Sequence, residues 1–170
     1  MNKKGLDIDG VCLNFSARFI EVCAEKGIYL NVDKTWNFFD QDIRCYDVFK
    51  GLTSDFWLSL KRDEQSLDLN FTPTAYISHR SCPTEVTRQS LLQVGFPDAP
   101  VFHVHHTDDK VKIAKDLALD VFVDDRASTV LYFLENNMNA LCLDKIYNED
   151  YNLPRIYTLG ELGSDELWGV

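Results

Sequence analysis

Six polar residues in this chain have side-chain types that could together transfer a phosphoryl group. They are Asp7, Asp9, Ser78, Lys110, Asp124 and Asp125. A carboxylate can attack phosphorus and form a covalent intermediate that water later hydrolyses. Because a carboxylate and a phosphate dianion repel each other, the attack needs a divalent cation held by further carboxylates. A lysine and a hydroxyl group can then stabilise the charge that develops on the phosphoryl oxygens.

The overall composition indicates a globular protein and narrows the choice of partner. The 170 residues are 45% hydrophobic, which fits one domain with a small inserted subdomain. The formal net charge is −10, and the longest basic run is Lys3-Lys4, so a long nucleic acid is not an expected partner. A small anionic substrate is still compatible with this charge, because a bound cation can invert the local field.

Cysteine usage and hydropathy predict a cytoplasmic protein. The five cysteines include no Cys-x-x-Cys pair, so we expect reduced thiols and neither a disulfide framework nor a zinc knuckle. No apolar run approaches the roughly 20 residues of a membrane helix, and no apolar signal region precedes Asp7. Both a monomer and a homodimer agree with the sequence.

Short apolar runs alternate with amphipathic segments, which is typical of a parallel sheet with helical connections. The pattern predicts a Rossmann-like α/β sheet of about five strands flanked by helices. We expect the strands at residues 4–7, 74–78, 100–104, 120–124 and 139–143. We expect helices at residues 15–24, 83–94, 108–117 and 129–136, and a short one near 159–162 in an otherwise irregular tail.

A segment rich in aromatic and charged residues separates the first two predicted strands. We expect residues 15–69 to form a small helical cap, inserted into an α/β core made of residues 1–14 and 70–170. Parallel sheets of this kind bind ligands beyond the carboxyl ends of their strands. The candidate chemical residues all fall at or just after predicted strand ends, as this rule requires.

Two motifs, Asp7-Ile8-Asp9-Gly10-Val11 and Val121-Phe122-Val123-Asp124-Asp125-Arg126, resemble the first and fourth motifs of the haloacid dehalogenase superfamily of phosphatases. The resemblance implies that Asp7 is the nucleophile and a Mg²⁺ ligand. It implies that Asp9 is the general acid and base, and that Asp9 also coordinates the metal through its backbone carbonyl. Phosphatases of the superfamily keep a carboxylate two residues after the nucleophile whereas dehalogenases do not, so Asp9 favours phosphate chemistry.

The same resemblance assigns the remaining residues to the phosphate and the metal. It implies that Ser78, His79 and Lys110 bind the phosphate, and that Asp124 and Asp125 complete the Mg²⁺ site. Lys112 lies on the same predicted helix as Lys110 and is an alternative for the lysine that bridges nucleophile and phosphate.

The run Tyr76-Ile77-Ser78-His79-Arg80, with Gly95-Phe96-Pro97, is similar to superfamily members related to 5′(3′)-deoxyribonucleotidases. This similarity implies a deoxynucleoside monophosphate as substrate and a cap whose aromatic residues, Trp36 or Phe39, stack on the base. The same aromatic residues could instead form the core of the cap. Sugar phosphates, other small metabolites and nucleic-acid ends are alternative substrates, and a catalytically silent binding protein is an alternative function.

Two further features admit more than one interpretation. His103, His105 and His106 are clustered, and alternate strand residues share a face, so a zinc site is an alternative to contacts with the phosphate end of the substrate or to a packed loop. Arg80 could contact the substrate, or it could be a surface residue that caps the next helix.

Overall fold

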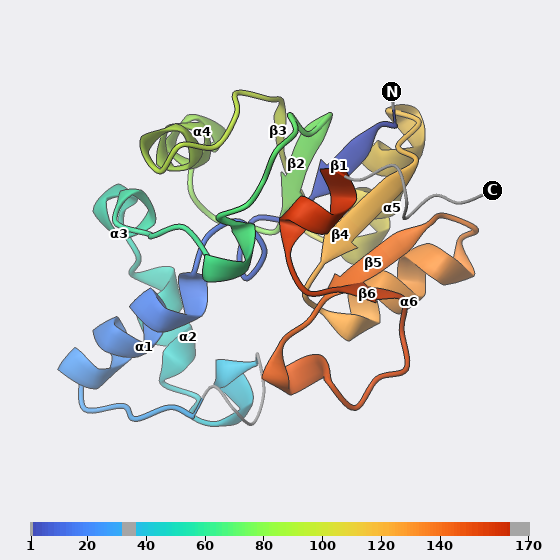
Figure 1. Ribbon diagram of the computed structural model, residues 1–170. Coiled ribbons are helices and arrows are strands. Elements are labelled where there is room, and N and C mark those ends of the chain that lie inside the picture. The colour runs from blue at the N-terminus through green and yellow to red at the C-terminus, as the bar shows by residue number, and fades with distance from the viewer. Residues whose placement is uncertain (1, 32–36, 164–170) are drawn as a thin grey trace.

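The computed structural model describes residues 2–31 and 37–163 of the chain, and within them six strands form one parallel sheet (Figure 1). The strand order is β3-β2-β1-β4-β5-β6. The strands are β1 (Lys4–Leu6), β2 (Ala75–Ser78), β3 (Val101–His103), β4 (Val121–Asp124), β5 (Ala140–Leu143) and β6 (Arg155–Ile156). The predicted Rossmann-like α/β class is confirmed, and five of the strands lie where the sequence predicts them.

The sixth strand, β6, corrects the prediction of about five strands and an irregular tail. It has two residues and pairs with the end of β5, where Cys142 faces Arg155 and Leu143 faces Ile156. Two residues are too few to show an alternating pattern, so this strand has no sequence signal of its own. The tail also contains the 3-10 helices η3 (Ile146–Asn148) and η4 (Leu159–Gly163), and η4 lies where the short helix was predicted.

The two faces of the sheet are covered by separate apolar clusters, because successive strand side chains point to opposite faces. Phe122 packs with α5 (Thr107–Asp116) and α6 (Ala127–Glu135) on one face. Val121 and Val123 pack on the other face, in the cluster that includes residues of α4 (Thr84–Gln93) and η4. Pro83, predicted inside the first turn of α4, is the residue that precedes the helix.

Several short helices lie between β1 and β2, and Figure 1 shows α1 and α2 to one side of the sheet. The elements are α1 (Phe15–Glu25), η1 (Phe38–Asp40), α2 (Cys45–Lys50), α3 (Ser54–Leu58) and η2 (Glu64–Ser66). Helix α3 is attached to the core, because the Ser90 hydroxyl on α4 donates a 2.8 Å hydrogen bond to the carbonyl of Trp57. The division into cap and core stays a prediction. Within the described ranges, no helix is both long and apolar enough to cross a membrane.

Candidate active site

The strand register places Asp7 and Asp124 side by side at the carboxyl edge of the sheet. Strand β1 pairs with β2 on one side and β4 on the other, which is the point where the strand order reverses. Leu6 faces Val123, and the Asp7 amide donates a 2.9 Å hydrogen bond to the Val123 carbonyl. Ligands of open α/β sheets bind in the crevice at such a switch point.

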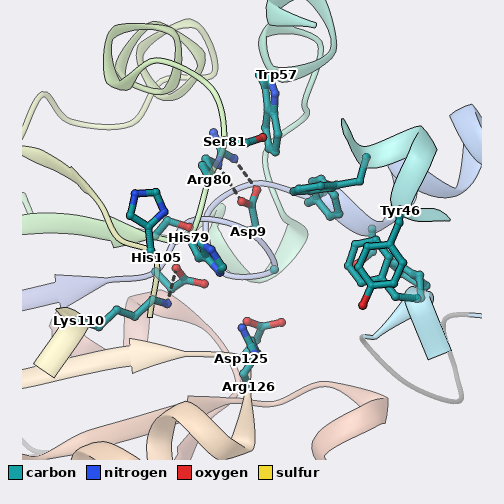
Figure 2. Close-up of a pocket in the computed structure, with 18 of the residues that line it drawn as sticks. Asp9, Tyr46, Trp57, His79, Arg80, Ser81, His105, Lys110, Asp125 and Arg126 are labelled. Carbon is teal, nitrogen blue, oxygen red and sulfur yellow. Dashed lines mark hydrogen bonds and ion pairs between the residues drawn. The ribbon is translucent and has the colours of Figure 1, made fainter. Parts of the chain in front are cut away.

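Lys110 joins these two carboxylates. Its Nζ lies 2.9 Å from Asp7 Oδ1 and 2.7 Å from Asp124 Oδ2 (Figure 2 draws the contact with Asp7), and all three residues are buried. Burial alone would lower the pKa of Lys110, but Asp124 and Asp7 together raise it above its usual value. Lys112 is exposed on α5, so the structure brings Lys110, rather than Lys112, to Asp7.

Asp125 completes an acidic cluster with Asp7 and Asp124, in which one carboxylate oxygen from each residue lies within 4.8 Å of the others. The Tyr147 hydroxyl donates a short hydrogen bond to Asp125 Oδ2, whereas Oδ1 is buried and has no hydrogen-bond partner among the described residues. Burial and the neighbouring Asp124 and Asp7 raise the pKa of Asp125 to about 8. Lys110 thus bonds directly to two of the three carboxylates, those of Asp7 and Asp124.

This cluster fits a divalent cation. Carboxylate oxygens are the ligands that Mg²⁺ prefers, and Asp125 Oδ1 is a buried acceptor to which no described residue donates a hydrogen bond. Gly10 has φ +84°, and a Cβ atom there would collide with the Asp125 carboxylate, so the loop after β1 passes directly against this acid. The residues that could hold the ion are Asp7, Asp124 and Asp125.

Asp9 lies on the same loop and is bound by Arg80, which follows β2. Arg80 Nε donates to Asp9 Oδ2 at 2.8 Å and Nη2 donates to Oδ1 at 2.5 Å (Figure 2). Burial raises the pKa of Asp9 above its usual value, although Arg80 acts in the opposite direction. Arg80 is buried, so the interpretation of a surface residue capping the next helix is wrong.

A cavity of about 500 Å³ lies over these residues. One side is polar and includes Asp7, Asp9, Ser78, His79 and Lys110. The cavity is within the size range of small-molecule sites, and it places all the predicted phosphate-binding residues on one side. Burial lowers the pKa of His79, and the nearby Arg126 and Lys110 lower it further.

The opposite side of the cavity is aromatic and comes from the segment between β1 and β2. Phe39 stacks on Tyr46 with a centroid distance of 4.3 Å and an interplanar angle of 16°, and Phe49 lies edge-on to Phe39. We call Phe39, Tyr46 and Phe49 the aromatic wall. The predicted residue Trp36 lies outside the described residues, whereas Phe38, Phe56 and Trp57 are buried.

Sequence reasoning missed several residues that line this cavity, among them Phe15, Tyr46 and Arg126. Phe15 begins α1 at helical spacing and Arg126 is the last residue of the fourth motif, so their positions were a usable signal. Tyr46 lies on a six-residue helix that no pattern predicted, and it is 45% exposed.

The histidine cluster does not form a metal site. His103 Nε2 lies 3.0 Å from the Thr87 hydroxyl on α4, while His105 and His106 are exposed. Among residues 2–31 and 37–163, the three aspartates are the only group of three side chains with ligand atoms this close together. The zinc alternative therefore has no support.

Known structures share this fold. A haloacid dehalogenase superfamily hydrolase from Geobacter sulfurreducens is 13% identical with a TM-score of 0.60, over 99% of this chain and 97% of that chain. A phosphatase of the superfamily from Thermococcus onnurineus is 17% identical with a TM-score of 0.55, over 99% and 98%. A 2-haloacid dehalogenase from Pseudomonas syringae is 16% identical with a TM-score of 0.54, over 99% and 100%. The fold is thus that of this superfamily, and it is common to phosphatases and a dehalogenase.

Sequence comparison adds one curated relative. A Bacillus cereus protein provisionally named a nucleotidase is 27% identical over 81 residues, which is 46% of this chain. The match spans 43% of that protein, less than half of its length. No family model matches the chain.

Proposed function

We propose that this protein is a Mg²⁺-dependent phosphomonoester hydrolase in which Asp7 forms an aspartyl-phosphate intermediate. The observation that carries the proposal is the buried contact of Lys110 with Asp7 and Asp124, at the base of a cavity that Asp9 also lines. The shared fold includes a dehalogenase, and Asp9 is the residue that favours phosphate chemistry over dehalogenation.

In this mechanism the Asp7 carboxylate attacks phosphorus, and the bond from phosphorus to the leaving oxygen breaks. Asp9 donates a proton to that oxygen, and then accepts one from the water that attacks the phosphoenzyme and releases phosphate and Asp7. Lys110 and the Ser78 hydroxyl stabilise charge on the phosphoryl oxygens. Bound Mg²⁺ would screen the repulsion between the carboxylate and the phosphate. Its ligands would be Asp7, Asp124, Asp125 and the Asp9 carbonyl.

The preferred substrate in this proposal is a deoxynucleoside monophosphate. The aromatic wall supports it, because a nucleobase is a flat group that can stack on an aromatic ring. The partial similarity to a protein provisionally named a nucleotidase supports it too. The cavity volume of about 500 Å³ agrees with a ligand of this size.

The first test replaces Asp7 with asparagine, which keeps the shape of the side chain but removes the nucleophile. We expect Asp7→Asn to lower phosphate release by about 1,000-fold or more, and a chelator to abolish release by the unchanged protein. Asp116→Asn, at an exposed position on α5, is the matched control and should retain activity. Retained Mg²⁺-dependent turnover in Asp7→Asn would exclude the mechanism.

The second test is a screen of phosphate release from nucleoside monophosphates, sugar phosphates and a short oligonucleotide with a terminal phosphate. We expect a deoxynucleoside monophosphate to give the highest kcat/KM. If sugar phosphates lead and nucleotides are inert, the nucleotide substrate is wrong while the phosphatase mechanism stands. If every phosphomonoester is inert in the presence of Mg²⁺, the binding-protein alternative is favoured.

A further inference from the structure

Arg80 is a buried charged residue to which the reaction above gives no role. It lies two residues beyond the end of β2, and its side chain has no solvent-exposed surface. Burying a guanidinium group is costly unless its charge is paired and its donors are satisfied. The contacts that satisfy Arg80 therefore indicate what it does.

Two of those contacts are made to Asp9. Nε and Nη2 donate to the two different carboxylate oxygens of Asp9, at 2.8 Å and 2.5 Å. A planar guanidinium that binds a carboxylate in this two-point manner restricts both the position and the rotation of that carboxylate. Each carboxylate oxygen has a second lone pair, so this arrangement leaves Asp9 able to exchange a proton with a reacting group.

The other contacts hold Arg80 itself in place. Nη1 lies 3.4 Å from the hydroxyl of Thr87, which in turn contacts His103 on β3. The guanidinium carbon lies 4.9 Å from the ring centre of Trp57, which is buried on α3. Arg80 is thus held by residues of α4 and α3, whereas Asp9 lies on the loop that follows β1.

We propose that Arg80 is a positioning residue for Asp9. By binding both carboxylate oxygens, it directs Asp9 at the oxygen of the leaving group and later at the attacking water. The inference rests on the proposed phosphatase function and adds a residue to it. Arg80 forms no hydrogen bond or ion pair with Asp7, Asp124 or Asp125, and its bonds to Asp9 go to the side chain, so its effect on the reaction passes through the Asp9 carboxylate.

This role predicts a dependence on the leaving group. A nucleoside leaves as an alkoxide that needs a proton from Asp9, whereas p-nitrophenolate is stable as an anion and leaves without one. The second step, attack of water on the phosphoenzyme, needs Asp9 as a base for either substrate. Loss of Arg80 should therefore slow both steps with a nucleotide but only the second step with p-nitrophenyl phosphate.

The experiment compares Arg80→Met, Arg80→Lys, Asp9→Asn and the two double variants that combine each Arg80 change with Asp9→Asn. For Arg80→Met we expect kcat on the best nucleoside monophosphate to fall by about 100-fold, with KM changed less than about threefold. With p-nitrophenyl phosphate we expect a burst of product equal to the enzyme concentration, followed by slow turnover. Arg80→Lys should not restore kcat, because an ammonium group lacks the two-point geometry.

The double variants separate positioning from structural damage. If Arg80 acts through Asp9, the Arg80 substitutions should reduce kcat by less than about threefold once Asp9→Asn is present. Arg88→Met is the matched control. Arg88 is a partly exposed arginine on α4 paired with Asp98 at 2.8 Å, outside the cavity, and its loss should leave kcat unchanged. Circular dichroism and thermal unfolding check that each variant folds.

Three results would overturn the inference: an unchanged kcat in Arg80→Met, a full restoration by Arg80→Lys, or equal losses in the presence and absence of Asp9. If Arg80→Met does not fold, Arg80→Lys and its double variant decide the question in the same way. Failure of the proposed function gives a different result, because the unchanged protein would then lack Asp7-dependent turnover.

Discussion

At the scale of single residues, three partners hold the four acidic side chains of the candidate site. Lys110 holds Asp7 and Asp124, Arg80 holds Asp9, and the Tyr147 hydroxyl holds Asp125. Groups that are oriented before the substrate binds need no reorganisation during the reaction, which is where electrostatic catalysis gains most. The partners come from α5, from the segment after β2 and from η3, so three distant parts of the chain orient one site.

Tyr147 provides a prediction about the metal. The Tyr147 hydroxyl donates to Asp125 Oδ2, which leaves Oδ1 as the oxygen of Asp125 that has no hydrogen-bond partner among the described residues. Removing that hydroxyl in Tyr147→Phe should weaken Mg²⁺ binding by about 10-fold or more, as is typical for residues that orient a metal ligand. Isothermal titration of Mg²⁺ into the folded variant measures this directly.

The control for this prediction is Tyr151→Phe, at a residue that is 49% exposed, and its Mg²⁺ affinity should equal that of the unchanged protein. An unchanged affinity in Tyr147→Phe would show that Asp125 does not need its tyrosine partner.

The sequence predicts the position of a site residue well where that residue lies at the end of a strand. Asp7 and Asp124 end adjacent parallel strands, so their proximity follows from the sheet. The choice between Lys110 and Lys112 depends on the rotation of α5, because residues two apart point to different sides of a helix. The pairing of Arg80 with Asp9 joins residues 71 positions apart and depends on how loops fold, so no local pattern indicates it.

At the scale of elements, the helices between β1 and β2 differ in how they are attached. Helix α3 is bonded to α4, and its Trp57 ring stacks on Phe15 at 5.7 Å. The aromatic wall lies instead on η1 and α2, which have three and six residues. Helices this short are not stable alone, so aromatic packing maintains them.

The aromatic wall should affect substrate binding more than chemistry. We expect Tyr46→Ala and Phe39→Ala each to raise KM for a deoxynucleoside monophosphate by about 5-fold to 10-fold, because a stacking surface is lost. The value of kcat should change little, and KM for glycerol phosphate, which has no ring to stack, should stay constant. Steady-state kinetics with both substrates measure the difference.

Tyr29→Ala is the matched control, since Tyr29 is 86% exposed and does not line the cavity. Equal changes in KM for both substrates would contradict stacking as the source of specificity.

Element prediction follows the strength of the local pattern. The strands Ala75–Ser78 and Val121–Asp124 are fully buried, and each has three apolar residues before a final polar one, so the sequence locates them well. Strand β6 forms because it pairs with β5, and helix α2 forms because its aromatic residues pack. Both are tertiary contacts, so neither element has a periodic pattern in its own sequence.

At the scale of the whole molecule, negative charge dominates, and the site concentrates it. The net charge of the chain is −10, and three buried carboxylates lie together at the site, where Lys110 bonds directly to Asp7 and Asp124. Bringing these carboxylates together in the fold is unfavourable, and the raised pKa of Asp125 expresses that cost. A bound divalent cation would offset it, so metal binding and folding stability should be coupled.

This coupling predicts a pH-dependent effect of Mg²⁺ on thermal stability. The pKa of Asp125 is about 8 in the folded protein and 3.8 in its ordinary state, so the folded protein keeps a proton that the unfolded chain has lost. Without metal, stability should therefore fall as pH rises from about 4 to about 8. Mg²⁺ binds the ionised carboxylate, so each pH unit below the folded pKa should lower its apparent affinity by about tenfold.

We expect saturating Mg²⁺ to raise Tm by about 5 °C or more near pH 8, and by less than about 2 °C near pH 5.5. Differential scanning fluorimetry measures both shifts, with KCl at equal ionic strength as the control for screening. Asp125→Asn removes the titrating group and should reduce the shift near pH 8 to that seen near pH 5.5. Equal shifts at the two pH values, or a full shift in Asp125→Asn, would show that Asp125 is not part of the metal site.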